Sequence, residues 1–98
     1  KRQIYGRGGD DSLHGDSGDD EVYGGLGNDR VTGDSGKDVL YGGAGADTMH
    51  GGTNADVVYG GQGDDSLDGG GGKNTLDGGP QSDTCENGTT YVSCEMIL

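Results

Sequence analysis

The chain has 98 residues, 25 glycines and a formal net charge of −12 at pH 7. It contains no Phe or Trp, and Leu, Ile and Val together number only 14. This composition argues against a conventional core, because so few apolar side chains cannot offset the roughly 1–2 kcal/mol of conformational entropy that each residue loses on ordering. The charge disfavours nucleic acid and anionic membranes as partners and attracts cations, and no stretch is long enough to span a membrane.

The chain begins with Lys1, without a methionine or a signal peptide, so we expect a mature or excised segment. Residues 3–5 form a predicted partial strand, and a nine-residue unit then repeats without interruption from residue 6 to residue 86. The unit reads Gly-Gly-x-Gly-x-Asp-x-apolar-x, and a fixed period of this kind determines the architecture. Every copy opens on glycine: Gly6, Gly15, Gly24, Gly33, Gly42, Gly51, Gly60, Gly69 and Gly78.

Two further positions of the unit are nearly constant. The sixth position holds Asp11, Asp20, Asp29, Asp38, Asp47, Asp56, Asp65, Asn74 and Asp83. The eighth position holds Leu13, Val22, Val31, Leu40, Met49, Val58, Leu67, Leu76 and Cys85. An acidic, disordered linker would explain the composition, but a linker has no reason to place an apolar residue at every ninth position.

These in-register copies resemble the repeats-in-toxin (RTX) family, whose glycine-rich nonapeptides bind calcium in secreted bacterial proteins. The resemblance covers residues 6–86 closely, and residues 3–5 and 87–95 as partial turns. It implies an all-β fold, a right-handed parallel β-roll (β-solenoid), with calcium held between stacked loops. It implies no particular activity, because such repeats are attached to toxins, proteases, lipases, epimerases and adhesins alike. We expect residues 1–98 to form a single domain of this kind.

Each unit divides into a six-residue loop and a three-residue strand, whose central side chain points away from its two neighbours. If each loop turns the chain by half a coil, 18 residues complete one coil and consecutive strands lie in two opposed sheets. The eighth-position side chains then meet between the sheets. The repeats give about five coils, and at about 4.8 Å per strand the stack is about 24 Å long.

Loops that lie 18 residues apart stack at the same edge, and each stacked pair is a predicted calcium site. Calcium takes six to eight oxygen ligands, which the sixth-position carboxylates and inward-facing loop carbonyls can supply. The site that involves Asn74 should bind calcium more weakly than its neighbours, because its amide oxygen carries no charge. The predicted carbonyl ligands belong to the first and third positions: Gly6, Gly8, Gly15, Ser17, Gly24, Leu26, Gly33, Ser35, Gly42, Ala44, Gly51, Thr53, Gly60, Gln62, Gly69, Gly71 and Gly78.

Counting the gaps between stacked loops gives about four sites at one edge and about three at the other. About seven Ca²⁺ ions would bring a charge of about +14, which nearly balances the −12 of the chain. A few of the aspartates could instead act only as turn residues that hydrogen-bond their own backbone.

A second pattern with an 18-residue period places Tyr5, Tyr23, Tyr41 and Tyr59 on one outer face. This tyrosine ladder can stabilise its sheet through cross-strand contacts. Alternatively, it is a binding face for a neighbouring domain, another copy of the chain or a polysaccharide.

Residues 87–98 lose the calcium pattern and form a predicted capping turn. Cys85 and Cys94 both fall at the eighth position, on opposed strands, and a disulfide between them would replace the missing ion and suit an oxidising compartment. Two reduced cysteines that fill the core are the alternative. Asn87-Gly88-Thr89 is also a glycosylation sequon, which matters only in a glycosylating secretory host.

No pattern in the sequence predicts an enzyme. Gly15-Asp16-Ser17-Gly18 imitates a serine-protease string, but it lies in register with the repeat and has no credible base beside it. We therefore predict a calcium-binding structural module that folds on calcium binding outside the cell and stabilises or presents a covalently attached domain of a secreted protein. The alternatives are a carbohydrate- or surface-binding module that uses the tyrosine ladder, and a self-assembling extracellular rod.

Overall fold

The structure is a computed structural model that describes residues 3–80 and 83–97. Those residues form short β-strands and no helix, and hence no helix that could cross a membrane. The strands are β1 (Gln3–Tyr5), β2 (Ser12–His14), β3 (Glu21–Tyr23), β4 (Arg30–Thr32), β5 (Val39–Tyr41), β6 (Thr48–His50), β7 (Val57–Tyr59), β8 (Ser66–Asp68), β9 (Thr75–Asp77), β10 (Thr84–Glu86), β11 (Thr90–Val92) and β12 (Met96–Ile97).

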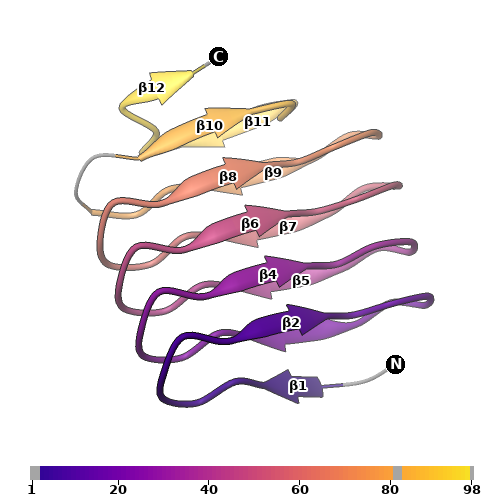
Figure 1. Cartoon of the computed structure of the whole chain (residues 1–98). Helices are drawn as coiled ribbons and strands as arrows, with labels where there is room; N and C mark the ends of the chain where they lie inside the picture. The colour runs from indigo at the N-terminus through magenta and orange to yellow at the C-terminus, as the bar shows by residue number, and fades with distance from the viewer. Residues whose placement is uncertain (1–2, 81–82, 98) are drawn as a thin grey trace.

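The strands alternate between two parallel sheets, as Figure 1 shows. One sheet has the order β1-β3-β5-β7-β9-β11, and the other has the order β2-β4-β6-β8-β10-β12. Ile4 pairs with Val22 in the first sheet and Leu13 with Val31 in the second, so the repeat distance is 18 residues. The predicted all-β solenoid of about five coils is therefore confirmed. Its extents are 30 × 30 × 13 Å, so it is a flat slab rather than a narrow rod.

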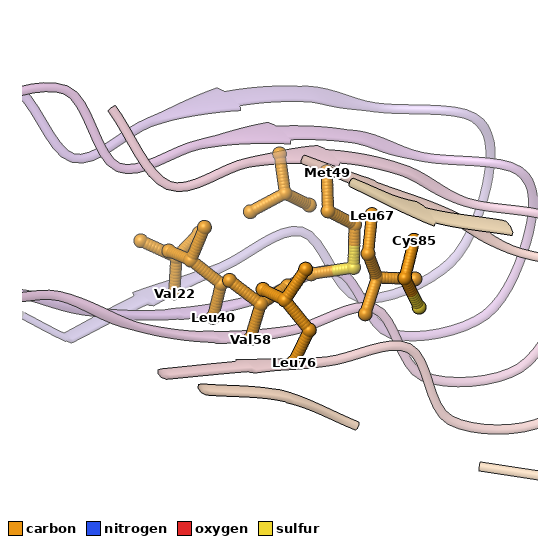
Figure 2. Close-up of a cluster of buried hydrophobic side chains, with 8 residues drawn as sticks. Val22, Leu40, Met49, Val58, Leu67, Leu76 and Cys85 are labelled. Carbon is orange, nitrogen blue, oxygen red and sulfur yellow. The ribbon is translucent and has the colours of Figure 1, made fainter. Parts of the chain in front are cut away.

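The core is a single row of side chains between the two sheets, one from each of the strands β3 to β10 (Figure 2). It consists of the eighth-position residues from the second repeat onward, which are 0–1% exposed: Val22, Val31, Leu40, Met49, Val58, Leu67, Leu76 and Cys85. Ile4 and Leu13 in the first coil and Tyr91 in the last pack against this row and are only partly buried. A core this thin leaves most of the stabilisation to the loops.

The loops turn because two of their residues take the left-handed backbone conformation. Gly25 and Gly27, at the second and fourth positions of one loop, have φ angles of 87° and 100°. Glycine adopts this conformation without steric strain. Arg7 and Asp34 replace a second-position glycine, and they adopt φ values of 72° and 70° in spite of their side chains. The backbone path of the loop is thus the same in every described repeat, whichever residue occupies the position.

The C-terminal coil departs from the 18-residue register. Tyr91 in β11 pairs with Leu76, fifteen residues earlier, and Ile97 in β12 pairs with Cys85, twelve residues earlier. The prediction that Cys94 holds the eighth position of a strand was therefore wrong, because Tyr91 takes that place and Cys94 follows β11. The reason is the length of the turn: only residues 87–89 separate β10 from β11, whereas six residues join the strands of the regular repeats.

Candidate metal centre

Each sixth-position residue lies at the end of its loop, immediately before a strand, and its side chain turns into the protein. Asp20 and every later residue of the set, Asn74 included, is at most 3% exposed. Asp11 in the first coil is partly buried. Burying an ionised carboxylate is costly unless a partner compensates its charge, so a row of buried aspartates requires explanation.

From Asp29 onward, one oxygen of each sixth-position side chain connects two coils. The Oδ1 atom accepts a hydrogen bond from the backbone N–H of the sixth-position residue 18 residues earlier, as Asp47 Oδ1 does from Asp29 at 2.8 Å. These bonds form two columns, one along each edge of the slab. The first column contains Asp11, Asp29, Asp47, Asp65 and Asp83. The second column contains Asp20, Asp38, Asp56 and Asn74.

The other oxygen has no such use. The Oδ2 atom is buried and accepts no hydrogen bond in Asp11, Asp29, Asp38, Asp47, Asp56, Asp65 and Asp83. Native proteins rarely leave buried polar atoms without a partner, and a bound ion is one of the standard explanations for such atoms. These orphaned oxygens fit the donor set that calcium requires.

Backbone carbonyl oxygens approach each orphaned Oδ2. A Cβ atom added to Gly42 would lie 2.6 Å from Asp47 Oδ2 and 2.6 Å from the carbonyl oxygen of Gly60 in the next coil. Glycine is therefore required at the first position for space, not for its φ angle. The oxygens of Asp47 and Gly60 are both hydrogen-bond acceptors. A pair of acceptors without a donor between them suits a cation.

Burial favours the neutral form of five of the carboxylates in the two columns. Desolvation by burial raises the pKa of Asp38 to about 6, of Asp47 and Asp56 to about 7, and of Asp65 to about 8, and it also raises the pKa of Asp83. The backbone hydrogen bond to Oδ1 acts in the opposite direction, and repulsion from the neighbouring carboxylate of the column adds to the increase. A bound cation would offset this cost and allow these side chains to stay ionised.

No three His, Cys, Asp or Glu side chains converge on one point within residues 3–80 and 83–97. A metal ion held by this fold would consequently take one carboxylate from each loop and complete its coordination with backbone oxygens. The sixth-position side chains therefore stay predicted ligands. The individual carbonyl ligands of the first and third positions stay a prediction.

Asn74 differs from the aspartates in a way that the sequence did not reveal. Its Oδ1 accepts the Asp56 N–H at 2.8 Å, as an aspartate would. Its Nδ2, at the place of Oδ2, lies near four backbone oxygens: those of Gly71 at 3.2 Å, Asn87 at 3.2 Å, Gly70 at 3.3 Å and Gly72 at 3.5 Å. Second- and fourth-position carbonyls thus also face the site, and sequence reasoning had missed them.

The two other predicted features of the chain are present as well. The rings of Tyr5, Tyr23, Tyr41 and Tyr59 stack with centroids 4.7–5.0 Å apart and interplanar angles of 1–8°. Cys85 and Cys94 form a disulfide, with their Cα atoms 6.0 Å apart. The disulfide joins the core strand β10 to the turn after β11, at the C-terminal end of the slab.

Comparisons with known proteins agree with this geometry. Neither the curated proteins nor the solved structures gave a match. The sequence profile of the RTX calcium-binding nonapeptide repeat, which contains four copies of the unit, matches residues 3–31, 23–58 and 50–85. These matches overlap, so together they run without a gap from residue 3 to residue 85.

Proposed function

We infer that the chain, which belongs to the family of RTX calcium-binding nonapeptide repeats, is a structural module that folds when it binds calcium. About seven Ca²⁺ ions lie between stacked loops and link each coil to the next. The ions order the chain outside the cell, and the ordered roll stabilises or presents a covalently attached domain of a secreted protein.

One observation carries this proposal: seven buried carboxylate oxygens have no hydrogen-bond donor. A divalent cation compensates a buried carboxylate and binds the neighbouring carbonyl oxygens at the same time, which a proton on one oxygen does less completely. The sixth-position aspartates would hold the ions together with the first- and third-position carbonyls. Calcium would supply positive charge and a bridge between loops, and about +14 from about seven ions would offset the net charge of −12.

The thin core supports a role for calcium in folding itself. Eight apolar side chains are fully buried, and they must order a chain with 25 glycines. Each glycine loses more conformational entropy on folding than any other residue. Ligand binding that occurs only in the folded state supplies the missing free energy.

The disulfide supports a location outside the cell. Bonds such as that between Cys85 and Cys94 persist in oxidising compartments and are rare where thiols are kept reduced. Secretion and extracellular folding are therefore compatible with the chemistry of this chain.

The tyrosine ladder supports a stabilising role. Because the rings lie face to face, the faces of Tyr23 and Tyr41 are covered by their neighbours and are not available for stacking on a sugar ring. Cross-strand stacking of this kind contributes roughly 0.2–1 kcal/mol per pair. Carbohydrate binding by the ladder, and self-assembly into a rod, stay predictions.

The proposal is tested by circular dichroism during a calcium titration of the purified chain. We expect a disordered spectrum in excess chelator and a cooperative change to a β-type spectrum as calcium is added. Magnesium at the same concentration is the matched control, because it screens charge equally but demands near-octahedral geometry at shorter distances. A chain that keeps its β structure in chelator, or that orders equally well in magnesium, would contradict the proposal.

A further inference from the structure

The two columns end differently at the C-terminal side of the slab. The first column ends at Asp83, whose Oδ2 is buried and accepts no hydrogen bond. The second column ends at Asn74, which has an amide nitrogen at the corresponding place. Both residues are 1% exposed, so the difference between them is chemical and not one of burial.

The amide nitrogen of Asn74 occupies the same place as a carboxylate oxygen elsewhere. A Cβ atom added to Gly60 would lie 2.7 Å from Asp65 Oδ2, and one added to Gly69 would lie 2.7 Å from Asn74 Nδ2. The carbonyl of the next coil also approaches both points, from Gly78 in one case and from Asn87 in the other. The two points therefore share their nearest polar contacts, and they differ in that the side-chain atom is an acceptor at Asp65 and a donor at Asn74.

The orientation of the Asn74 amide follows from its neighbours. Oδ1 faces the N–H of Asp56, and Nδ2 faces the carbonyl oxygens of Gly71 and Asn87. The reversed amide would set a donor against the Asp56 N–H and an oxygen among carbonyl oxygens, losing every one of these hydrogen bonds. The observed orientation alone satisfies the site without an ion.

Asn74 also binds the C-terminal turn through its backbone. Its carbonyl oxygen accepts hydrogen bonds from the N–H groups of Thr89 at 2.8 Å and Thr90 at 3.0 Å. With the additional bond from Nδ2 to the Asn87 oxygen, Asn74 binds residues 87–90 through both its backbone and its side chain. Asn87 in turn donates a hydrogen bond from its Nδ2 to Asp68 Oδ1 at 2.8 Å.

We propose that Asn74 closes the second column without calcium: its side-chain amide, rather than an ion, links the loop of residues 69–72 to the turn at Asn87. This inference rests on the proposed function, because it states which end of the calcium-bound stack takes no ion. The amide supplies two N–H donors to a ring of carbonyls that a cation would otherwise have to bind. One contact between successive coils is thus made by the chain itself, without calcium.

Substitutions that exchange a hydrogen-bond donor and an acceptor in a sixth-position side chain test the proposal. In Asn74→Asp an acceptor replaces the donor, and we expect the variant to bind one more Ca²⁺ ion than the wild type at saturating calcium. Asp65→Asn makes the opposite exchange in the first column, and we expect it to bind one ion fewer. Native mass spectrometry counts the ions directly, and isothermal titration calorimetry provides an independent stoichiometry.

A second measurement does not depend on a variant that folds. In the calcium-loaded wild type, the side-chain amide protons of Asn74 should exchange with solvent at least tenfold more slowly than those of the exposed Asn54, as read from nitrogen–proton NMR spectra. Equal calcium counts in the wild type and Asn74→Asp, or fast exchange at Asn74, would overturn the inference while leaving calcium-driven folding intact. A wild type that binds no calcium would overturn the proposed function and this inference together.

Discussion

At the scale of single residues, the role of an aspartate in this molecule depends on the surroundings of its second carboxylate oxygen. Asp47 and Asp19 each accept one backbone N–H at 2.8 Å, from Asp29 and Lys37 respectively. Asp19 is exposed, whereas Asp47 is 1% exposed and its Oδ2 accepts no hydrogen bond. The two side chains have the same charge and accept the same kind of hydrogen bond. Comparing variants at these two positions therefore separates calcium coordination from the effects of charge and of that hydrogen bond.

We predict that Asp47→Ala raises the calcium concentration at the folding midpoint by about tenfold or more. The change removes a proposed calcium ligand and leaves the buried Asp29 N–H without its acceptor. Loss of that acceptor costs about 1–3 kcal/mol, and about 1.4 kcal/mol corresponds to a factor of ten. The midpoint is measured by circular dichroism during a calcium titration.

Asp19→Ala is the control for this prediction. It removes one negative charge and one acceptor, but water can replace the acceptor at an exposed site, so the midpoint should change by less than about twofold. Similar midpoints for the two variants would show that Asp47 contributes only charge.

The sixth-position residues could be predicted from the sequence because the nine-residue period fixes both their spacing and their chemistry. The atoms around them could not. Sequence reasoning treated Asn74 as a weaker ligand, yet the structure uses its nitrogen as a donor to Gly71 and Asn87. Which end of an amide faces a site is decided by the neighbouring backbone, and the residue type alone does not contain that information.

At the scale of the elements, loops and not strands carry the stability of the molecule. Each strand has three residues or fewer, and each of β3 to β10 contributes one buried side chain to the core, as β5 does with Leu40. The loops that end at Asp20 and at every later aspartate of the set each contribute a buried carboxylate to a column along one edge. The charges within a column repel one another, because carboxylates that lie 18 residues apart are neighbours in successive coils.

The raised pKa values predict that acid orders the chain when calcium is absent. Carboxyl groups with a higher pKa in the roll than in the unfolded chain bind protons more tightly when folded, so their contribution is complete below about pH 4. It is lost as the pH rises through the folded pKa values, from about 6 for Asp38 to about 8 for Asp65. We expect more β structure at pH 4 than at pH 8 in circular dichroism with excess chelator.

Potassium chloride at about 0.5 M and pH 8 is the control for the acid experiment. The salt screens repulsion between exposed charges but does not neutralise buried carboxylates, so it should restore less structure than acid does. Equal order at both pH values in chelator would show that the two columns do not titrate with folding.

The strands and their pairing were predictable wherever the loop was regular. From β1 to β10, each strand lies at the seventh to ninth positions of its unit and pairs with its neighbour 18 residues away, as Ile4 does with Val22. The prediction failed at β11, because it extended the nine-residue period beyond the last glycine-rich loop. A turn of three residues has a different geometry, so Tyr91 and not Cys94 pairs with Leu76 in the sheet.

At the scale of the whole molecule, the slab behaves as a stack in which each coil contacts its immediate neighbours. The stability of such a stack is approximately a sum over coils and the interfaces between them. Its C-terminal end is closed by the short turn, by Asn74 and by the Cys85–Cys94 disulfide. Local changes at this end should therefore remain local.

We predict that Cys94→Ala destabilises the last coil by about 2–3 kcal/mol, because the disulfide no longer restricts the unfolded chain. Hydrogen exchange of the calcium-loaded protein should accelerate in β10, β11 and β12 and stay unchanged in β3 and β5. Wild-type protein treated with a reducing agent should reproduce this pattern. Uniform acceleration along the whole chain would contradict a nearest-neighbour stack.

Successive nine-residue units alternate between the two sheets, and this alternation limits which changes in the number of units the fold can accept. Inserting or deleting one unit after Tyr23 would carry Tyr41 and Tyr59 across to the side of His14 and Thr32, and the aromatic stack would be cut in two. Adding or removing two units would leave every later residue on its original side. Duplications in this lineage should therefore survive mostly in even numbers.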